Sequence, residues 1–232
     1  IQYFGSLEAA WRAPQDLLKN SGLPSKSVDQ IIAFRRDKNL EQLMAKIQAS
    51  GIQVITWDDE SYPRRLKETA APPPVLYIRG EITRDDDMAV AIVGTRRMTA
   101  YGRQISEELA TFLANNGITI VSGLARGVDA AAHRAAIKAA GRTFAVLGCG
   151  VDIVYPPEHR SLAADIIENG ALISDYAPGT PPESANFPPR NRIISGLSMA
   201  TVVVEAGEKS GALITATFAA EQGREVFAVP GN

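Results

Sequence analysis

The sequence predicts an α/β protein with a doubly wound, mostly parallel sheet, preceded by a small helical domain. Three observations support this class. After about residue 70, short apolar runs alternate with stretches of about 10–15 residues that suit helices. These runs are continuous rather than alternating, as expected for strands covered on both faces. Before residue 70, apolar residues recur at helical intervals instead.

The N-terminal part of the chain predicts helices. Apolar side chains recur three and four residues apart in three groups, namely Leu7, Ala10 and Trp11; Val28, Ile31 and Ile32, continued by Arg35; and Leu40, Leu43, Met44 and Ile47. A short strand pattern follows at residues 52–57. The Ala-Pro-Pro-Pro run at residues 71–74 cannot lie inside a helix and marks a joint. We therefore place the domain boundary within residues 60–75, with a helical domain and linker over residues 1–70 and a sheet domain over residues 71–232.

The sheet domain has strand, turn and helix in repeated order. Strands are predicted at Val75–Arg79, Ala89–Val93, Thr119–Ser122, Phe144–Leu147, Leu172–Ser174, Ala200–Val204 and Val226–Val229. Helices are predicted between them, over about residues 102–116, 127–140, 159–169, 190–198 and 211–222. This alternation favours parallel strands joined by helical crossovers.

Composition limits the class of protein. The chain has 232 residues, of which 45% are hydrophobic and 22% charged, typical of a globular protein. The formal net charge of −2 excludes a generally basic protein, so a nucleic-acid site would be a local patch. No apolar run approaches the roughly 18–20 residues of a membrane span, so no membrane partner is expected. A single Cys fits a reducing compartment, and we therefore expect the protein in the cytoplasm. Two His and one Cys are too few for a structural zinc site, so none is predicted.

Five turns follow the predicted strands at the sheet edge where doubly wound proteins bind ligands. They are Gly94-Thr95-Arg96-Arg97, Ser122 to Gly127, Gly148-Cys149-Gly150-Val151-Asp152, Ser174 to Gly179, and Glu205 to Gly211. Glycine lets a backbone approach a ligand closely, and helix N-termini suit phosphate. The sequence predicts that six cations share this edge, namely Arg96, Arg97, Arg126, Arg190, Arg192 and Lys209. The alternative is that strand-to-helix turns contain glycine whatever they bind.

The segment Phe187–Leu197 combines an aromatic ring, two prolines and two arginines before an apolar run. Arg suits phosphate oxygens, and Phe offers a flat face on which a nucleobase can stack. Tyr155 and Tyr176 are further stacking candidates. The alternative is a helix start whose arginines form structural ion pairs and whose Phe covers the core.

Several signals of known chemistry are absent from the sequence. Gly148 and Gly150 are not followed by the third glycine of a dinucleotide site, and Lys209-Ser210 lacks the glycine spacing of a P-loop. No serine-nucleophile elbow is present. We expect His133 to be a packed residue in an Ala-rich helix, His159 to lie in a surface loop, and Cys149 to be a small packed residue rather than a nucleophile. No cofactor is predicted.

Taken in order, the turns resemble the DprA/Smf family, the DNA-processing proteins of bacterial natural transformation. The resemblance covers about residues 75–231. Its motifs are Ala91-Ile92-Val93-Gly94-Thr95-Arg96; Val121 to Asp129 with Ala132-His133; Leu147 to Asp152 with Tyr155-Pro156; Phe187 to Ser198; and Val203 to Ala206 with Ser210 to Ala216, closing at Val229-Pro230-Gly231. Five ordered motifs are far more specific than a lone glycine-rich loop.

The resemblance implies an extended Rossmann-like domain that binds single-stranded DNA without sequence preference, forms a homodimer, protects incoming strands and loads the RecA recombinase. The phosphate-holding turn of the family matches Gly94, Thr95 and Arg96, with Thr in place of Ser. Asp175 stands where the family usually has Glu. The N-terminal helices resemble the family's sterile-alpha-motif-like domain, which this sequence enters partway. The family's segment after the last Pro-Gly, and the winged-helix-like domain of many members, are expected to lie outside it.

We therefore predict a groove for single-stranded DNA. Its expected residues are Gly94, Thr95, Arg96, Arg97, Ser122, Gly123, Arg126, Gly148, Gly150, Tyr155, Phe187, Arg190, Asn191, Arg192, Lys209, Ser210 and Gly211. Exposed residues of about 211–224 are candidates for dimer and recombinase contacts. No residue set predicts a reaction, so a binding and loading factor is expected rather than an enzyme. The alternative is a nucleotide-processing enzyme of the phosphoribohydrolase type, whose Pro-Gly-Gly-x-Gly-Thr motif is replaced here by Glu208 to Leu213.

Overall fold

The computed structural model describes residues 3–231, which divide into two compact units between Ser50 and Gly51. The first unit is helical. Its helices are α1 (Leu7–Arg12), α2 (Gln15–Asn20), α3 (Ser25–Asp37) and α4 (Leu40–Ala49). Its small core contains Ala13, Leu18 and Val28, and the guanidinium of Arg35 donates hydrogen bonds to the carbonyls of Ala10 and Ala13 at the end of α1. Those bonds satisfy carbonyl groups that the end of a helix leaves without partners.

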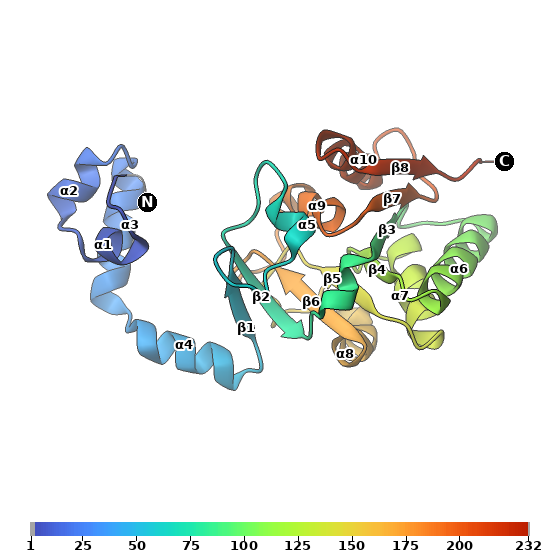
Figure 1. Ribbon diagram of the computed structural model, residues 1–232, viewed down its shortest axis with the longest axis horizontal. Helices are drawn as coiled ribbons and strands as arrows, with labels where there is room; N and C mark the ends of the chain where they lie inside the picture. The colour runs from blue at the N-terminus through green and yellow to red at the C-terminus, as the bar shows by residue number, and fades with distance from the viewer. Residues whose placement is uncertain (1–2, 232) are drawn as a thin grey trace. The chain divides into compact units, whose positions relative to one another are not determined.

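The second unit contains a sheet of eight strands in the order β1-β2-β6-β5-β4-β3-β7-β8 (Figure 1). The strands are β1 (Gln53–Thr56), β2 (Val75–Gly80), β3 (Ala89–Val93), β4 (Thr119–Ser122), β5 (Thr143–Val146), β6 (Gly170–Ser174), β7 (Ala200–Val203) and β8 (Glu225–Ala228). The six strands from β6 to β8 are parallel, whereas β2 pairs antiparallel with both β1 and β6. The prediction of a doubly wound, mostly parallel sheet is confirmed.

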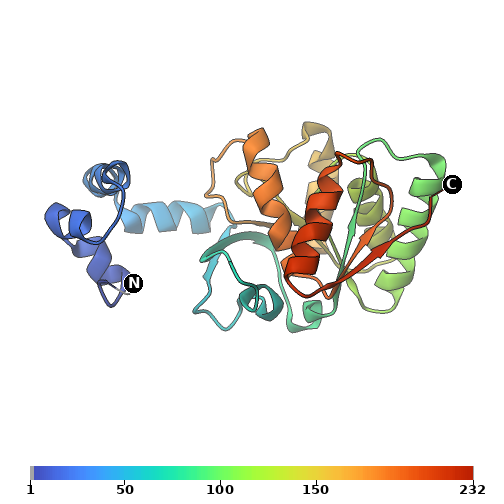
Figure 2. The same ribbon diagram turned by 90° about the horizontal axis from the view of Figure 1, so that it is seen from above.

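Helices cover both faces of the sheet (Figures 1 and 2). The helices of this unit are α5 (Arg64–Lys67), α6 (Ala100–Asn115), α7 (Val128–Lys138), α8 (Arg160–Glu168), α9 (Phe187–Gly196) and α10 (Gly211–Glu221). One core cluster joins α5, α9 and α10 to the strands, and another joins α6 and α7 to them. Strand β3 supplies both, because Ala91 and Val93 face the first core and Ile92 faces the second. This double burial explains why its sequence is continuously apolar.

Residues 51–70, which we expected to belong with the N-terminal helices, lie in the sheet unit instead. β1 pairs with β2 from Gln53↔Ile78 to Thr56↔Val75, and Leu66 of α5 is fully buried in the core with α9. The division therefore falls before the predicted range of residues 60–75. A short strand pattern followed by polar residues does not reveal its pairing partner, since that partner lies beyond the proline run.

The N-terminal ends of α9 and α10 are set by residues close by in the sequence. Pro188 and Pro189 occupy the first turn of α9, where a helix does not need their missing N–H groups, so the helix begins at Phe187 and not at residue 190. Ser210 caps α10, because its Oγ accepts a hydrogen bond from the N–H of Ala212 at 3.3 Å. Among residues 3–231, no helix is both long enough and apolar enough to cross a membrane.

Candidate single-stranded nucleic-acid site

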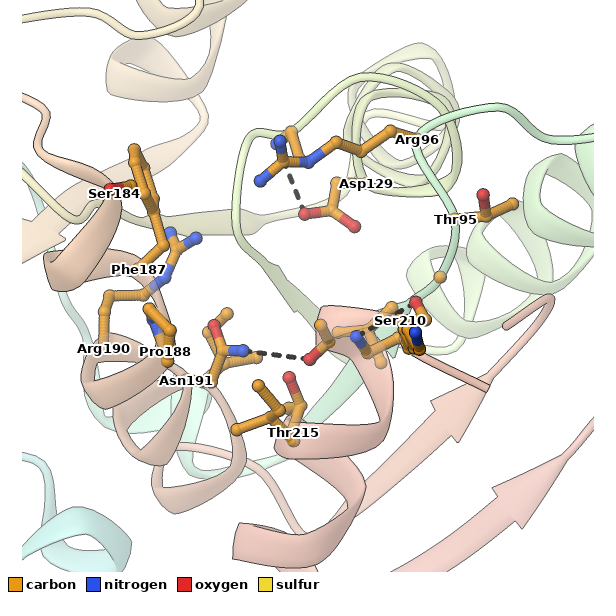
Figure 3. A pocket seen from close by; sticks show the side chains of 18 of the residues that line it. Thr95, Arg96, Asp129, Ser184, Phe187, Pro188, Arg190, Asn191, Ser210 and Thr215 are labelled. Carbon is orange, nitrogen blue, oxygen red and sulfur yellow. Dashed lines mark hydrogen bonds between the residues drawn. The ribbon is translucent and has the colours of Figure 1, made fainter. Parts of the chain in front are cut away.

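The site is a pocket of about 760 Å³ at the carboxyl ends of β3 and β7 (Figure 3). The chain runs from β3 through β4, β5 and β6 in one direction of the sheet, and then returns to place β7 on the other side of β3. The connections therefore diverge on either side of β3, and such a topological switch point is where doubly wound sheets leave a crevice for ligands.

Five segments far apart in the sequence line the pocket. They are the β3–α6 turn (Val93, Gly94, Thr95, Arg96, Arg97), the start of α7 (Ala125, Asp129), Tyr155, the segment leading into α9 with α9 itself (Pro182, Ser184, Phe187, Pro188, Arg190, Asn191, Ile194), and the β7–α10 turn with α10 (Gly207, Lys209, Ser210, Gly211, Ala212, Ile214, Thr215). In Figure 3, Phe187, Arg190 and Asn191 lie on one side, opposite Arg96, Thr95 and Ser210.

One part of the lining suits phosphate. Arg96, Arg97 and Lys209 are exposed, and within the described residues none of them forms an ion pair with a carboxylate. The N-terminus of the 11-residue α10 begins at Gly211 on the same wall. Free N–H groups and the positive end of a helix dipole attract an anion, and the neighbouring cations add charge-assisted hydrogen bonds.

Hydrogen bonds hold the turn that carries Thr95 and Arg96 against the start of α7. The N–H of Val128 donates to the carbonyl of Thr95 at 3.2 Å, and the N–H of Arg97 donates to the Thr95 hydroxyl at 3.2 Å. Gly127 lies directly beneath, at φ +78°, and a Cβ there would overlap the Thr95 carbonyl oxygen. Glycine is required at this position both by its backbone conformation and by the close approach.

A second part of the lining is aromatic. The rings of Tyr155 and Phe187 lie 5.6 Å apart between centroids with 37° between their planes. The Arg190 guanidinium lies 5.8 Å from the Phe187 centroid. A Cβ on Gly148 would come within 2.9 Å of the Phe187 ring, so glycine leaves room for that ring at the end of β5. Flat faces next to cations are the combination on which nucleobases stack.

Arg190 and Asp129 form the buried back of the pocket, with 6% and 7% of their surfaces exposed. Arg190 donates to the carbonyls of Gly123 (3.0 Å) and Val146, and Asp129 accepts from the N–H groups of Gly123 (3.1 Å) and Ala125 (3.3 Å). Burial lowers the pKa of Arg190 to about 10, opposed by the charge of Asp129. Burial raises the pKa of Asp129 despite Arg190 and these hydrogen bonds. Arg190 stays a cation near neutral pH, and its Nε finds no partner among the described residues.

Asn191 links the two helices that form the pocket wall. Its side-chain amide donates to the carbonyl of Gly211 at 3.1 Å, and it is 8% exposed. The α10 N-terminus is thereby held beside α9. Asn191 therefore both lines the pocket and holds one of its walls in place.

The structure brings together most of the residues predicted from the sequence. The predicted residues that line the pocket are Gly94, Thr95, Arg96, Arg97, Tyr155, Phe187, Arg190, Asn191, Lys209, Ser210 and Gly211. Of the six cations expected on one edge, four therefore meet at the pocket.

The other two cations are engaged elsewhere. Arg126 forms an ion pair with Glu158 at 2.5 Å, and Arg192 pairs with Asp175 at 2.6 Å while also donating to the carbonyl of Ala71. These pairs use carboxylates 32 and 17 residues away in the sequence, so the local pattern did not predict them. Arg192 therefore follows the alternative of a structural ion pair at the start of a helix.

Four predicted glycine or serine residues and one tyrosine do not line the pocket, and they make packing contacts or hydrogen bonds outside it. Ser122 is buried and donates to the carbonyl of Ile92, and Gly123 gives space to Arg190 and Asp129. Gly148 accommodates Phe187, and Gly150 accommodates the loop after β6. Tyr176 donates its hydroxyl to the carbonyl of Asn186 at 3.4 Å and is not in the lining.

The prediction that His159 lies in a surface loop is wrong. Its side chain is 5% exposed, and Nδ1–H donates to the carbonyl of Leu124 at 2.9 Å. His133 and Cys149 are packed, as predicted. Burial raises the pKa of the Cys149 thiol to about 11, which disfavours the thiolate that a nucleophile requires.

The sequence did not predict about half of the lining, and three functional polar residues are among those it missed. Asp129 and Thr215 line the pocket, and Glu205 fixes its β3–α6 turn. Each stands inside a motif that carries the family resemblance. The available signal was position, because an acidic residue just after a strand, as Glu205 is after β7, indicates a contact at the sheet edge.

Comparison with known proteins agrees with this geometry. The family model described as DNA recombination-mediator protein A matches residues 53–232. Protein Smf of Synechocystis is 44% identical, over 100% of this chain and 59% of its own length, and DNA processing protein DprA of Bacillus subtilis is 42% identical, over 96% of this chain and 78% of its own length.

Two solved structures share the fold. DprA from Streptococcus pneumoniae superposes with a TM-score of 0.83 at 36% identity, covering 94% of this chain and 75% of that one. DprA from Helicobacter pylori, whose structure describes a single-stranded DNA binding mode of that protein, superposes with a TM-score of 0.71 at 33% identity, covering 78% and 81%. The chain spans about three fifths of the length of Smf from Synechocystis and Escherichia coli, at 59% and 61%. From its fold, its pocket motifs and these matches, the chain belongs to the DNA recombination-mediator protein A family, which includes DprA and Smf.

Proposed function

We propose that this protein binds single-stranded DNA without sequence preference, in the pocket at the switch point of its sheet. The observation that carries the proposal is the meeting of Arg96, Arg97 and Lys209 with the α10 N-terminus on one wall and Phe187 with Tyr155 on another. The cations suit phosphate, and the rings suit unstacked bases. The relative from Helicobacter pylori, described as binding single-stranded DNA, supports the same assignment.

The absence of sequence preference follows from the kinds of group in the lining. Phosphate contacts carry no sequence information, and every base has a flat face that can stack on an aromatic ring. The chain has a net charge of −2, so attraction must come from the local cluster of cations. Affinity should therefore fall steeply with salt.

We further propose that the bound strand is protected and passed to the RecA recombinase, that the protein works as a homodimer, and that it acts as a binding factor in the cytoplasm rather than as an enzyme. The family membership and the exposed apolar residue Leu213 on α10, which is outside the pocket lining, support a protein-contacting role. A direct check is whether the protein accelerates RecA filament formation on single strands that are already coated by another binding protein.

The test of the binding proposal is fluorescence anisotropy with labelled oligonucleotides across a salt series. We expect single strands to bind more tightly than duplex of equal length, with similar affinity for different base compositions. Arg96→Ala and Lys209→Ala should each weaken binding about tenfold, the effect of one charge-assisted hydrogen bond. Each should also reduce the slope of log affinity against log salt by about 0.7.

Lys138→Ala is the matched control, because Lys138 is an exposed cation at the C-terminal end of α7, away from the lining. It should bind like the unchanged protein. Equal losses in Lys138→Ala and Arg96→Ala would reject the pocket as the site. Binding or turnover of a nucleoside monophosphate, with no binding of DNA, would favour the phosphoribohydrolase alternative.

A further inference from the structure

One residue outside the pocket lining holds both ends of the turn that carries Arg96 and Arg97. At the start of the turn, the N–H of Thr95 donates to the backbone carbonyl of Glu205 at 2.7 Å. At its end, the N–H and hydroxyl of Thr99 donate to the two carboxylate oxygens of Glu205 at 2.9 and 2.5 Å. Glu205 thus joins the end of β7 to the β3–α6 turn across 106 residues of sequence.

The Glu205 carboxylate also occupies the N-terminus of α6. Thr99 is the N-cap of this helix, and its hydroxyl oxygen accepts from the N–H of Gly102 at 3.0 Å. A Cβ on Gly102 would overlap the Glu205 carboxylate, so glycine makes room for it in the first turn. A negative charge here is stabilised by the free N–H groups and by the helix dipole. The same position attracts phosphate in other proteins, and here it is already filled.

The geometry points to Glu205 as a positioning residue: it holds the β3–α6 turn so that Arg96 and Arg97 face the pocket, and it closes the α6 N-terminus to phosphate. An incoming anion is thereby directed to the α10 N-terminus, beside Ser210 and Lys209. The inference concerns the turn itself, and its effect on DNA affinity rests on the proposed function. It has an unusual consequence, because removing this negative charge next to a phosphate site should weaken the binding of an anion.

Three variants distinguish the hydrogen bonds of the Glu205 side chain from its negative charge. Glu205→Ala removes both the charge and the hydrogen bonds of the side chain. Glu205→Gln removes the charge and keeps one oxygen that can accept from the Thr99 N–H, while its NH2 group replaces the oxygen that accepts from the Thr99 hydroxyl. Glu208→Ala is the matched control, because Glu208 is an exposed acid in the same loop and, within residues 3–231, its side chain forms no hydrogen bond or ion pair.

The first measurement needs no DNA. Hydrogen exchange of the segment 94–103 should be about fivefold faster at the Thr99 amide in Glu205→Ala, the effect of one lost hydrogen bond, and unchanged in Glu205→Gln and Glu208→Ala. Thr99→Val, which removes only the hydroxyl, should give a smaller increase at Gly102 and serves if Glu205→Ala does not fold. Unchanged exchange in both Glu205→Ala and Thr99→Val would overturn the inference.

The second measurement is a double-mutant cycle on single-strand affinity. Glu205→Ala should weaken binding about tenfold with the melting temperature little changed, whereas Glu205→Gln and Glu208→Ala should bind as well as or better than the unchanged protein. In an Arg96→Ala/Arg97→Ala background, Glu205→Ala should cost no further affinity, within about twofold.

The two measurements fail in different ways. An equal loss of affinity with and without the two arginines would mean that Glu205 acts through general stability, which overturns the positioning role. If the unchanged protein bound no single-stranded DNA, the proposed function would fall, and the hydrogen-exchange result would still decide whether Glu205 holds the turn.

Discussion

At the scale of single residues, a cation near the pocket is not always free to bind a ligand. Arg126 follows β4 beside the pocket segments, but its guanidinium is held by Glu158 at 2.5 Å. Both side chains are about half exposed, at 57% and 47%, so water and salt weaken their attraction. A surface ion pair of this kind is easily exchanged for a phosphate, so under the proposed function Glu158 would compete weakly with DNA for Arg126.

Glu158→Gln should accordingly raise single-strand affinity about two- to fivefold at low salt, since an exposed ion pair holds its arginine only weakly. The gain should shrink as salt rises, because screening weakens the added contact. Anisotropy titrations at several salt concentrations measure it. Glu183→Gln is the control for the loss of one negative charge near the pocket. Glu183 is an exposed acid between the lining residues Pro182 and Ser184. If Glu158→Gln still gained affinity in an Arg126→Ala background, the competition argument would be refuted.

At the scale of elements, α7 shows how closely the helices of this fold lie on their neighbours. Ala132, Ala135 and Ala136 pack against α6 and the sheet, and small side chains allow this approach. His133 is fully buried in the same helix, where its Nδ1 is 2.6 Å from the Thr143 hydroxyl. That hydroxyl donates to the carbonyl of Ile120, so Nδ1–H is the donor to Thr143, and Nε2 carries no proton.

The burial of His133 makes stability depend on pH. Burial, with added repulsion from His159, Arg134 and Arg190, lowers its pKa to about 3 from an unfolded value of 6.5. Between these values the unfolded chain binds the proton and the folded chain does not. The stability present above pH 6.5 should therefore fall as the pH drops, by about 1.4 kcal/mol per pH unit from this group.

Urea unfolding of the unchanged protein and of His133→Gln at pH 7, 6 and 5 measures this effect. The variant starts from a lower stability, because it loses packing, but its stability should change less with pH across this range. The same pH dependence in both proteins would show that other groups are responsible.

At the scale of the whole molecule, the chain has two units with separate cores. The core of Ala13, Leu18 and Val28 belongs to the first unit, and the core clusters of the sheet described above belong to the second. Every residue that lines the pocket lies in the second unit, between Val93 and Thr215. The site should therefore not require the helical unit for its own geometry.

A chain that begins at Gly51 should fold cooperatively and keep the single-strand affinity of the longer chain. Its circular dichroism melting curve and an anisotropy titration, compared with those of residues 1–232, provide the measurement. A truncation that began at Ala71, as the proline run alone would suggest, should be destabilised, because it removes β1 and the buried Leu66. Loss of affinity in a folded chain starting at Gly51 would mean that the helical unit contributes to binding.

The elements of the sheet unit were predictable because they depend on local patterns. Buried parallel strands are continuously apolar, and their helices start and end at caps, prolines and glycines, so each strand was predicted to within a few residues. The glycine-rich turns at the strand ends were found for the same reason. Chain order alone also indicated that these turns share one edge, since parallel strands end on the same side.

Local sequence patterns therefore predict the fold class, the family motifs and eleven of the residues that line the pocket. The pairing of β7 with β3, which brings the turns at Thr95 and Ser210 to one pocket, became visible in the folded sheet. Only the tertiary structure decided that Arg126 and Arg192 are engaged by carboxylates, and that Glu205 holds a turn 106 residues away in the chain. The physical reason is that periodicity and turn chemistry act between neighbours in sequence, whereas ion pairs and positioning hydrogen bonds form between segments that only the folded sheet brings together.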